Sequence, residues 1–156
     1  MCGIAGVVGP LEHPEAVAAA MAARLDHRGP DARGTAVLST GAGDPAGVLA
    51  HTRLKIIDLS EAAAQPFEAL EGRVKLVFNG EIYNFRELRA ELEQRGHRFR
   101  SASDTEVILA RYLEHGERGL DALEGMFAFA LWDARANRLL LARDRLGKKP
   151  LYWVRT

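Results

Sequence analysis

The chain has 156 residues, of which 47% are hydrophobic and 27% charged, and its 21 basic side chains balance its 21 acidic ones. This composition is typical of one soluble globular domain with a sizeable core, and the evenly mixed charges argue against a surface that follows nucleic-acid phosphates. No stretch approaches the roughly 18 apolar residues of a membrane span, so we expect neither a membrane nor a nucleic-acid partner.

The first third of the chain is predicted to contain a strand, a helix and a hairpin. Residues 3–8 form a short apolar strand, and apolar residues at every fourth position predict an amphipathic helix over residues 14–26. Residues 35–38 and 48–51 have strand-like composition and are separated by the turn-rich segment 41–45. The two strands are therefore predicted to pair as a hairpin.

Two helices are predicted in the middle of the chain. The first covers residues 84–96, where Asn84 and Glu87 have the spacing of an N-cap pair. The second covers residues 103–116 and begins at Ser103, which has a glutamate three residues later in a capping-box pattern.

Four further strands are predicted, at residues 74–78, 126–132, 138–142 and 151–154. Helices and strands segregate along the chain instead of alternating, which favours an α+β sandwich over a doubly wound sheet.

The only cysteine, Cys2, is the second residue. If Met1 is removed, Cys2 gains a free α-amino group with a reference pKa of roughly 7.7 to 8.0, and this amine can accept the thiol proton during nucleophilic attack. The alternative is a buried cysteine that only packs. A single cysteine and the lack of a signal-peptide pattern favour a cytoplasmic protein.

Residues that could assist a cysteine nucleophile follow two of the predicted strands. The amide of Asn79 and the backbone N–H of Gly80 could stabilise an oxyanion, although Asn-Gly is also a common hairpin turn. Arg53 could pair with a carboxylate, and Asp104 in the first turn of a helix could bind an ammonium group. Together these groups suit an amino acid with a side-chain amide, which means glutamine or asparagine.

Basic residues cluster at one place in the sequence, near its end. The cluster consists of Arg143, Arg145, Lys148 and Lys149. It is interpreted as a turn and strand end, with contact to a phosphate or a partner domain as the alternative.

Seven sequence blocks in order resemble the class II glutamine amidotransferase domain, in particular that of glutamine-hydrolysing asparagine synthetases. The blocks begin at Met1-Cys2-Gly3-Ile4-Ala5-Gly6 and continue with His27-Arg28-Gly29-Pro30-Asp31, His51-Thr52-Arg53-Leu54, Phe78-Asn79-Gly80-Glu81-Ile82-Tyr83-Asn84, Ser103-Asp104-Thr105-Glu106, Gly125-Met126-Phe127-Ala128-Phe129-Ala130 and the segment 143–152. The resemblance covers the whole chain and implies a four-layer αββα sandwich of the N-terminal nucleophile hydrolase type.

The resemblance also implies the role of each site residue. Cys2 is the nucleophile, Asn79 and Gly80 form the oxyanion hole, and the substrate glutamine is bound by Arg53, Leu54, Glu81 and Asp104. No metal and no cofactor is expected in this domain.

The same resemblance implies that residues 2–156 are a glutaminase domain that is incomplete at its C-terminus, without a synthetase domain. A synthetase domain, in cis or in trans, would use ATP and Mg²⁺ to make asparagine from aspartate and the ammonia released here; a homodimer is also possible. The alternatives are a non-catalytic glutamine-binding or interaction remnant, and the front domain of a related amidotransferase or β-lactam synthetase.

Overall fold

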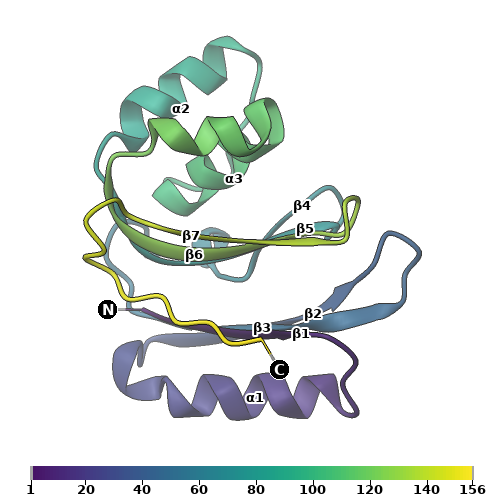
Figure 1. Cartoon of the computed structure of the whole chain (residues 1–156). Coiled ribbons are helices and arrows are strands. Elements are labelled where there is room, and N and C mark those ends of the chain that lie inside the picture. Colours follow the sequence, from purple (N-terminus) through teal and green to yellow (C-terminus); the bar gives the residue numbers. More distant parts are fainter. Residues whose placement is uncertain (1, 156) are drawn as a thin grey trace.

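The computed structural model describes residues 2–155, which form two antiparallel sheets packed face to face with helices on both outer sides (Figure 1). The first sheet has the order β1-β3-β2, with β1 at Gly3–Val8, β2 at Ala32–Ser39 and β3 at Pro45–Arg53. The second has the order β4-β5-β6-β7, with β4 at Phe67–Ala69, β5 at Val74–Ile82, β6 at Gly125–Asp133 and β7 at Arg138–Arg143.

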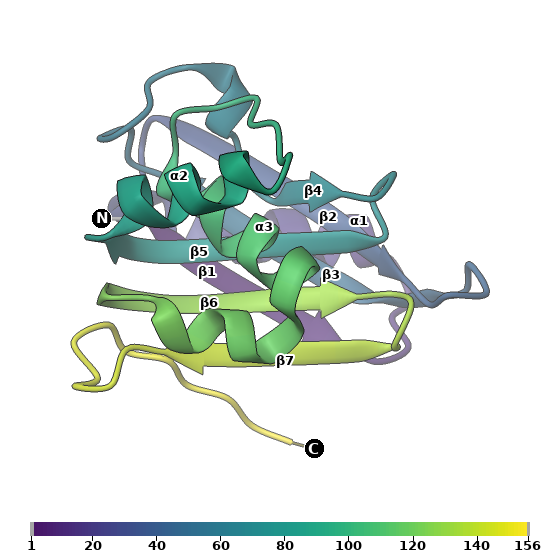
Figure 2. The ribbon, with the colours of Figure 1, turned by 90° about the horizontal axis from the view of Figure 1, so that it is seen from above.

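Three α-helices in the described residues complete the layers: α1 at Pro14–Arg24, α2 at Phe85–Gln94 and α3 at Asp104–His115. Helix α1 covers the first sheet, and α2 and α3 cover the second (Figures 1 and 2). The predicted αββα sandwich is therefore confirmed. None of the helices within residues 2–155 is long and apolar enough to cross a membrane.

Helix α1 packs on the first sheet through alanines rather than through its larger apolar residues. Ala18 and Ala22 are each only 1% exposed, whereas Val17 and Met21 are half-buried. Small side chains let the helix axis come close to the sheet. The helix ends at Arg24, two residues before the predicted end, and a short 3-10 turn follows it.

The central strands β5 and β6 are buried on both faces, as their nearly continuous apolar sequences indicate. Leu76 and Phe78 of β5 belong to the core beneath α2 and α3. Val77, between them in sequence, belongs to the cluster between the two sheets, together with Leu49 of β3. Odd-numbered residues of β5 in this region therefore face the first sheet.

The strand predicted over residues 151–154 is not formed. The chain leaves the second sheet after β7, and its last described segment descends to the level of the first sheet without forming a named strand (Figure 1). Tyr152, Trp153 and Val154 are 91%, 73% and 83% exposed. Their β-forming side chains predicted a strand, but no described strand offers them hydrogen-bond partners.

Four short elements of the described residues were not predicted: β4 and the 3-10 turns at Asp26–Arg28, Glu61–Ala63 and Gly116–Ala122. The predicted cap of α2 is also wrong, because the Asn84 side chain donates to Ala122 O and accepts from Glu124 N instead of capping the helix. The cap of α3 is correct, since Ser103 Oγ accepts from the backbone N–H of Glu106.

Leu92→Ala tests the packing between α2 and the second sheet. Leu92 is fully buried, so the substitution should lower the free energy of unfolding by about 2–5 kcal/mol. Leu146→Ala is the matched control, because Leu146 is 85% exposed, and should change it by less than about 0.5 kcal/mol. Urea unfolding measures both; equal effects would contradict this description of the core.

Candidate active site

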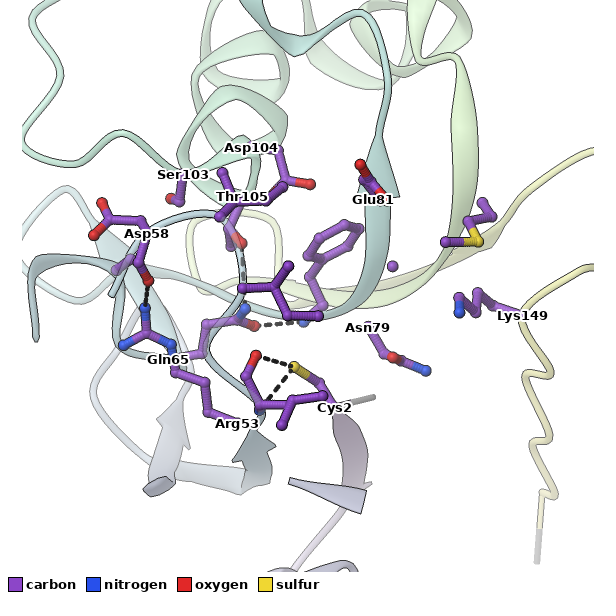
Figure 3. Close-up of a pocket in the computed structure, with 17 residues that line it drawn as sticks. Cys2, Arg53, Asp58, Gln65, Asn79, Glu81, Ser103, Asp104, Thr105 and Lys149 are labelled. Atoms are coloured by element: carbon purple, nitrogen blue, oxygen red, sulfur yellow. Dashed lines mark hydrogen bonds between the residues drawn. The ribbon is translucent and has the colours of Figure 1, made fainter. Parts of the chain in front are cut away.

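The structure brings all seven predicted site residues to one cavity of about 130 Å³ (Figure 3). The cavity lies where β1 begins and β3 ends in the first sheet. The residues of β5 in the second sheet and the start of α3 close it from the other side. The seven are Cys2, Arg53, Leu54, Asn79, Gly80, Glu81 and Asp104.

The thiol of Cys2 is held by the backbone of the neighbouring strand end. Antiparallel pairing places Gly3 opposite Thr52, so Cys2 lies beside the residues that follow β3. The N–H of Leu54 donates to Cys2 Sγ at 3.4 Å, and Arg28 Nε donates to the Cys2 carbonyl oxygen at 3.1 Å. Leu54 therefore contacts the Cys2 thiol directly, through its backbone.

The loop of residues 27–31 supports this arrangement from outside the cavity. Asp31 N–H donates to Arg53 O at 3.0 Å, and the Asp31 carboxylate accepts from Lys55 N–H at 2.8 Å. A Cβ on Gly29 would lie 2.5 Å from the carbonyl carbon of Thr52, so only glycine permits this close approach. The conspicuous His-Arg-Gly-Pro-Asp block thus fixes the end of β3.

Asn79 and Gly80 do not form a turn, because β5 continues through them to Ile82. The side chain of Asn79 shares a face with Val77 and therefore points toward the first sheet, which carries Cys2. In Figure 3 Asn79 and Cys2 lie on neighbouring walls of the cavity.

The backbone N–H of Gly80 points outward from the edge of β5 that does not pair with β6. Alternate residues of a strand present their N–H groups to the same side. On that side the Phe78 N–H donates to Gln65 Oε1 at 2.7 Å, and the Ile82 N–H donates to Asp104 Oδ2 at 3.0 Å. The Gly80 N–H lies between these two and faces the cavity. A Cβ here would lie 2.2 Å from Met126 O, which explains the glycine.

Arg53 is a buried cation whose hydrogen-bond partners are neutral. It is 6% exposed, and its guanidinium donates to the carbonyl oxygens of Ser60, at 2.9 Å, and Asp58. None of the ion pairs within residues 2–155 includes Arg53. Hydrogen bonds from neighbouring side chains lower the pKa of the Asp58 and Glu61 carboxyl groups, and the charge of Arg53 lowers both further. Its own hydrogen bonds go to neutral carbonyl oxygens, so an anionic ligand that pairs with it directly would be favoured here.

Asp104 provides the opposite charge on the far side of the cavity. Burial raises the pKa of its carboxyl group to about 6, and the negative charge of Glu81 adds to this, while the N–H groups of Ile82 and Thr105 oppose it. A cation beside Asp104 would relieve both causes of the raised pKa. Glu81 itself is exposed, at the mouth of the cavity.

Lys149, assigned from the sequence to a turn, is 5% exposed and lines the cavity. The carboxylate of Asp144 fixes the preceding turn by accepting from the N–H groups of Phe127, Lys148 and Lys149. Burial opposes ionisation of Asp144, but these N–H groups more than offset it, and its pKa lies below the usual range. The sequence identified Lys149 as part of a basic cluster, but it gave no signal that this side chain is buried.

Two further buried polar residues beside the site, His51 and Gln65, were not predicted as functional. His51 stands in one of the quoted blocks but was given no role there, and Gln65, which lines the cavity, lies outside the blocks. Burial lowers the pKa of His51 to about 4, and the charge of Arg53 also lowers it, while a hydrogen bond to Phe78 O opposes both. The ring is therefore neutral at neutral pH.

A four-layer sandwich with a cysteine just before its first strand, facing an asparagine side chain on the opposite sheet, is the fold of amidotransferases of the N-terminal nucleophile type. The chain belongs to the glutamine amidotransferase domain family, whose model matches residues 1–156. It is 39% identical, over 99% of its length, to asparagine synthetase [glutamine-hydrolyzing] 3 of Bacillus subtilis, and 48% identical, over 82%, to asparagine synthetase B of Escherichia coli.

The chain spans 25% and 22% of these two relatives. Among solved structures it resembles a glutamine phosphoribosylpyrophosphate amidotransferase from B. subtilis, with a TM-score of 0.71 and 21% identity over 90% of this chain and 37% of that one. The likeness to this solved structure concerns the fold alone.

Asp104→Asn tests the raised pKa of this buried carboxyl group. With a pKa of 3.8 when unfolded and about 6 when folded, Asp104 takes up protons on folding, so it lowers the free energy of unfolding as pH rises through that interval. The stability of the variant relative to the wild type should therefore rise between pH 4 and about 6 and then level off.

Urea unfolding at several pH values measures this difference. His51 titrates equally in both proteins and cancels from it. A difference that does not change with pH would contradict the raised pKa.

Proposed function

We propose that this chain hydrolyses glutamine to glutamate and ammonia through a thioester on Cys2. The observation that carries the proposal is the placement of one thiol opposite two amide donors, between a buried arginine that makes no direct ion pair within residues 2–155 and a buried carboxyl group. Such a cavity matches the amide, carboxylate and ammonium groups of glutamine.

The reaction follows from these contacts. The Cys2 sulfur attacks the side-chain carbonyl carbon of glutamine, and the negative charge on oxygen is stabilised by Asn79 Nδ2 and the Gly80 N–H. Each such donor typically contributes about 2.7–4 kcal/mol in the transition state. The carbon–nitrogen bond then breaks as the amide nitrogen takes up the proton and leaves as ammonia, and water hydrolyses the thioester to glutamate and the free thiol.

The α-amino group of Cys2 is proposed as the base that accepts the thiol proton and returns it to the departing ammonia. While Met1 is attached, this nitrogen is an amide and cannot act as a base. Removal of Met1 is therefore part of the proposal.

Glutamine would be oriented by its two charged ends. Arg53 would pair with the α-carboxylate, and Asp104 with Glu81 would hold the α-ammonium group. Leu54 would border the substrate on the side where its N–H contacts the thiol.

We further propose that the ammonia serves asparagine synthesis from aspartate, as the names of the relatives suggest. ATP and Mg²⁺ would act in a synthetase domain, in the same chain or in a partner chain, and not in the residues described here. Homodimer formation and action in the cytoplasm complete this proposal.

Cys2→Ala should abolish glutamate release, because the chain has no other cysteine to take over as nucleophile. The assay is glutamate formation from glutamine by the purified chain, with an intact-mass spectrum to establish that Met1 is absent. Circular dichroism should show the same fold for both proteins. Residual release above about 1% of the wild-type rate would reject Cys2 as the nucleophile.

Asp104→Asn should raise KM for glutamine about tenfold or more with a smaller change in kcat, because it removes the charge that holds the α-ammonium group. In the wild type, KM should rise as pH falls below about 6, where Asp104 takes up a proton. The variant should show no such rise. Steady-state kinetics between pH 5 and 8 test this, and identical pH profiles would exclude the role.

A further inference from the structure

Two buried side chains outside the proposed chemistry, Gln65 and His51, hydrogen-bond the same backbone residue. Gln65 is 9% exposed and accepts the N–H of Phe78 on its Oε1 at 2.7 Å. His51 is 1% exposed, and its Nε2 lies 3.2 Å from Phe78 O. Phe78 immediately precedes Asn79 and Gly80, the two proposed oxyanion donors.

These side chains take the place of a missing strand. Pairing between β4 and β5 ends where Phe67 lies opposite Leu76. Beyond that point β5 has no strand neighbour on this edge, and the N–H and C=O of Phe78 would be buried without partners. Gln65 satisfies the N–H and His51 satisfies the C=O.

The hydrogen-bond chemistry fixes the state of His51. A carbonyl oxygen can only accept, so the proton must be on Nε2. The imidazole also connects the two sheets, since His51 pairs with Ile4 on β1, two residues from Cys2. The same side chain therefore sets the position of β5 relative to the strand that carries the thiol.

Gln65 makes a second contact that connects β5 to α3. Its Nε2 donates to Thr105 Oγ1 at 3.2 Å, next to Asp104 in the first turn of the helix. Phe78 is thus held from the first sheet by His51 and from the helical side by Gln65, and both contacts are buried.

We propose that Gln65 and His51 are positioning residues for the oxyanion hole: they fix the backbone at Phe78 so that Asn79 and Gly80 meet the developing oxyanion at hydrogen-bonding distance. This inference rests on the proposed glutaminase function. Neither residue is assigned a contact with substrate.

The expected kinetic effect is a loss in kcat. An oxyanion forms only in the transition state, and a donor displaced by about 1 Å loses most of its stabilisation. Gln65→Met nearly keeps the side-chain volume and His51→Phe keeps a planar ring of somewhat larger volume; both remove the hydrogen bonds to Phe78. Each should lower kcat about 10- to 100-fold and change KM for glutamine less than twofold.

Conservative variants provide the rescue. His51→Gln keeps an N–H that can reach Phe78 O, and Gln65→Glu keeps an oxygen for the Phe78 N–H. Both should recover kcat to within about fivefold of the wild type. A second readout is the rate at which iodoacetamide alkylates Cys2, a reaction that forms no oxyanion, and this rate should be unchanged in all four variants.

The experiment compares the four variants with the wild type, all with Met1 removed and checked by circular dichroism. No cysteine-dependent glutamate release by the wild type would reject the proposed function itself. With an active wild type, unchanged kcat in Gln65→Met and His51→Phe would overturn the positioning role. Equal loss of alkylation, or failure of a variant to fold, would also overturn it by showing that these residues serve folding.

Discussion

The antiparallel pairing of β1 with β3 is the constraint on which the site depends. It places Gly3 opposite Thr52 and so puts Cys2 beside Arg53 and Leu54. A Cβ on Gly3 would lie 2.8 Å from Thr52 Oγ1 and 2.9 Å from Leu25 Cβ, so glycine is what lets β1 lie this close to its neighbours. A shift of one residue would turn every side chain of β1 to the other face, and the thiol would leave the cavity.

The two sheets contribute different groups to the cavity, and charged side chains lie at opposite sides of it. Asn79 and Gly80 come from β5, whereas Arg53 comes from β3, and Asp104 begins α3. The cavity contains a buried cation whose hydrogen bonds go to neutral groups and a carboxyl group whose pKa is raised to about 6. A zwitterion of the right length would favour both charges, which is the physical basis of the amino-acid substrate proposed above.

Sequence motifs predicted the fold and the location of the site better than the detailed contacts. The seven blocks placed Cys2, Arg53 and Asp104 in one cavity, as found. From the residues alone, a turn was the favoured interpretation of Asn79-Gly80, because this dipeptide is a common hairpin signal. The structure excludes the turn, since pairing with β6 continues past Gly80 to Ile82.

Other features depended on long-range contacts that leave little local trace. Asn84 has a capping residue's position but bonds to Ala122 and Glu124, about forty positions away in sequence. Gln65 follows an ordinary alanine-rich segment and gains its importance only because β4 stops short. The hold on Cys2 from both sides also has a practical consequence: an affinity tag fused ahead of it would start from the wall of the cavity and would block the α-amine. Purification handles for this domain therefore belong elsewhere, or must be cleaved to leave cysteine as the first residue.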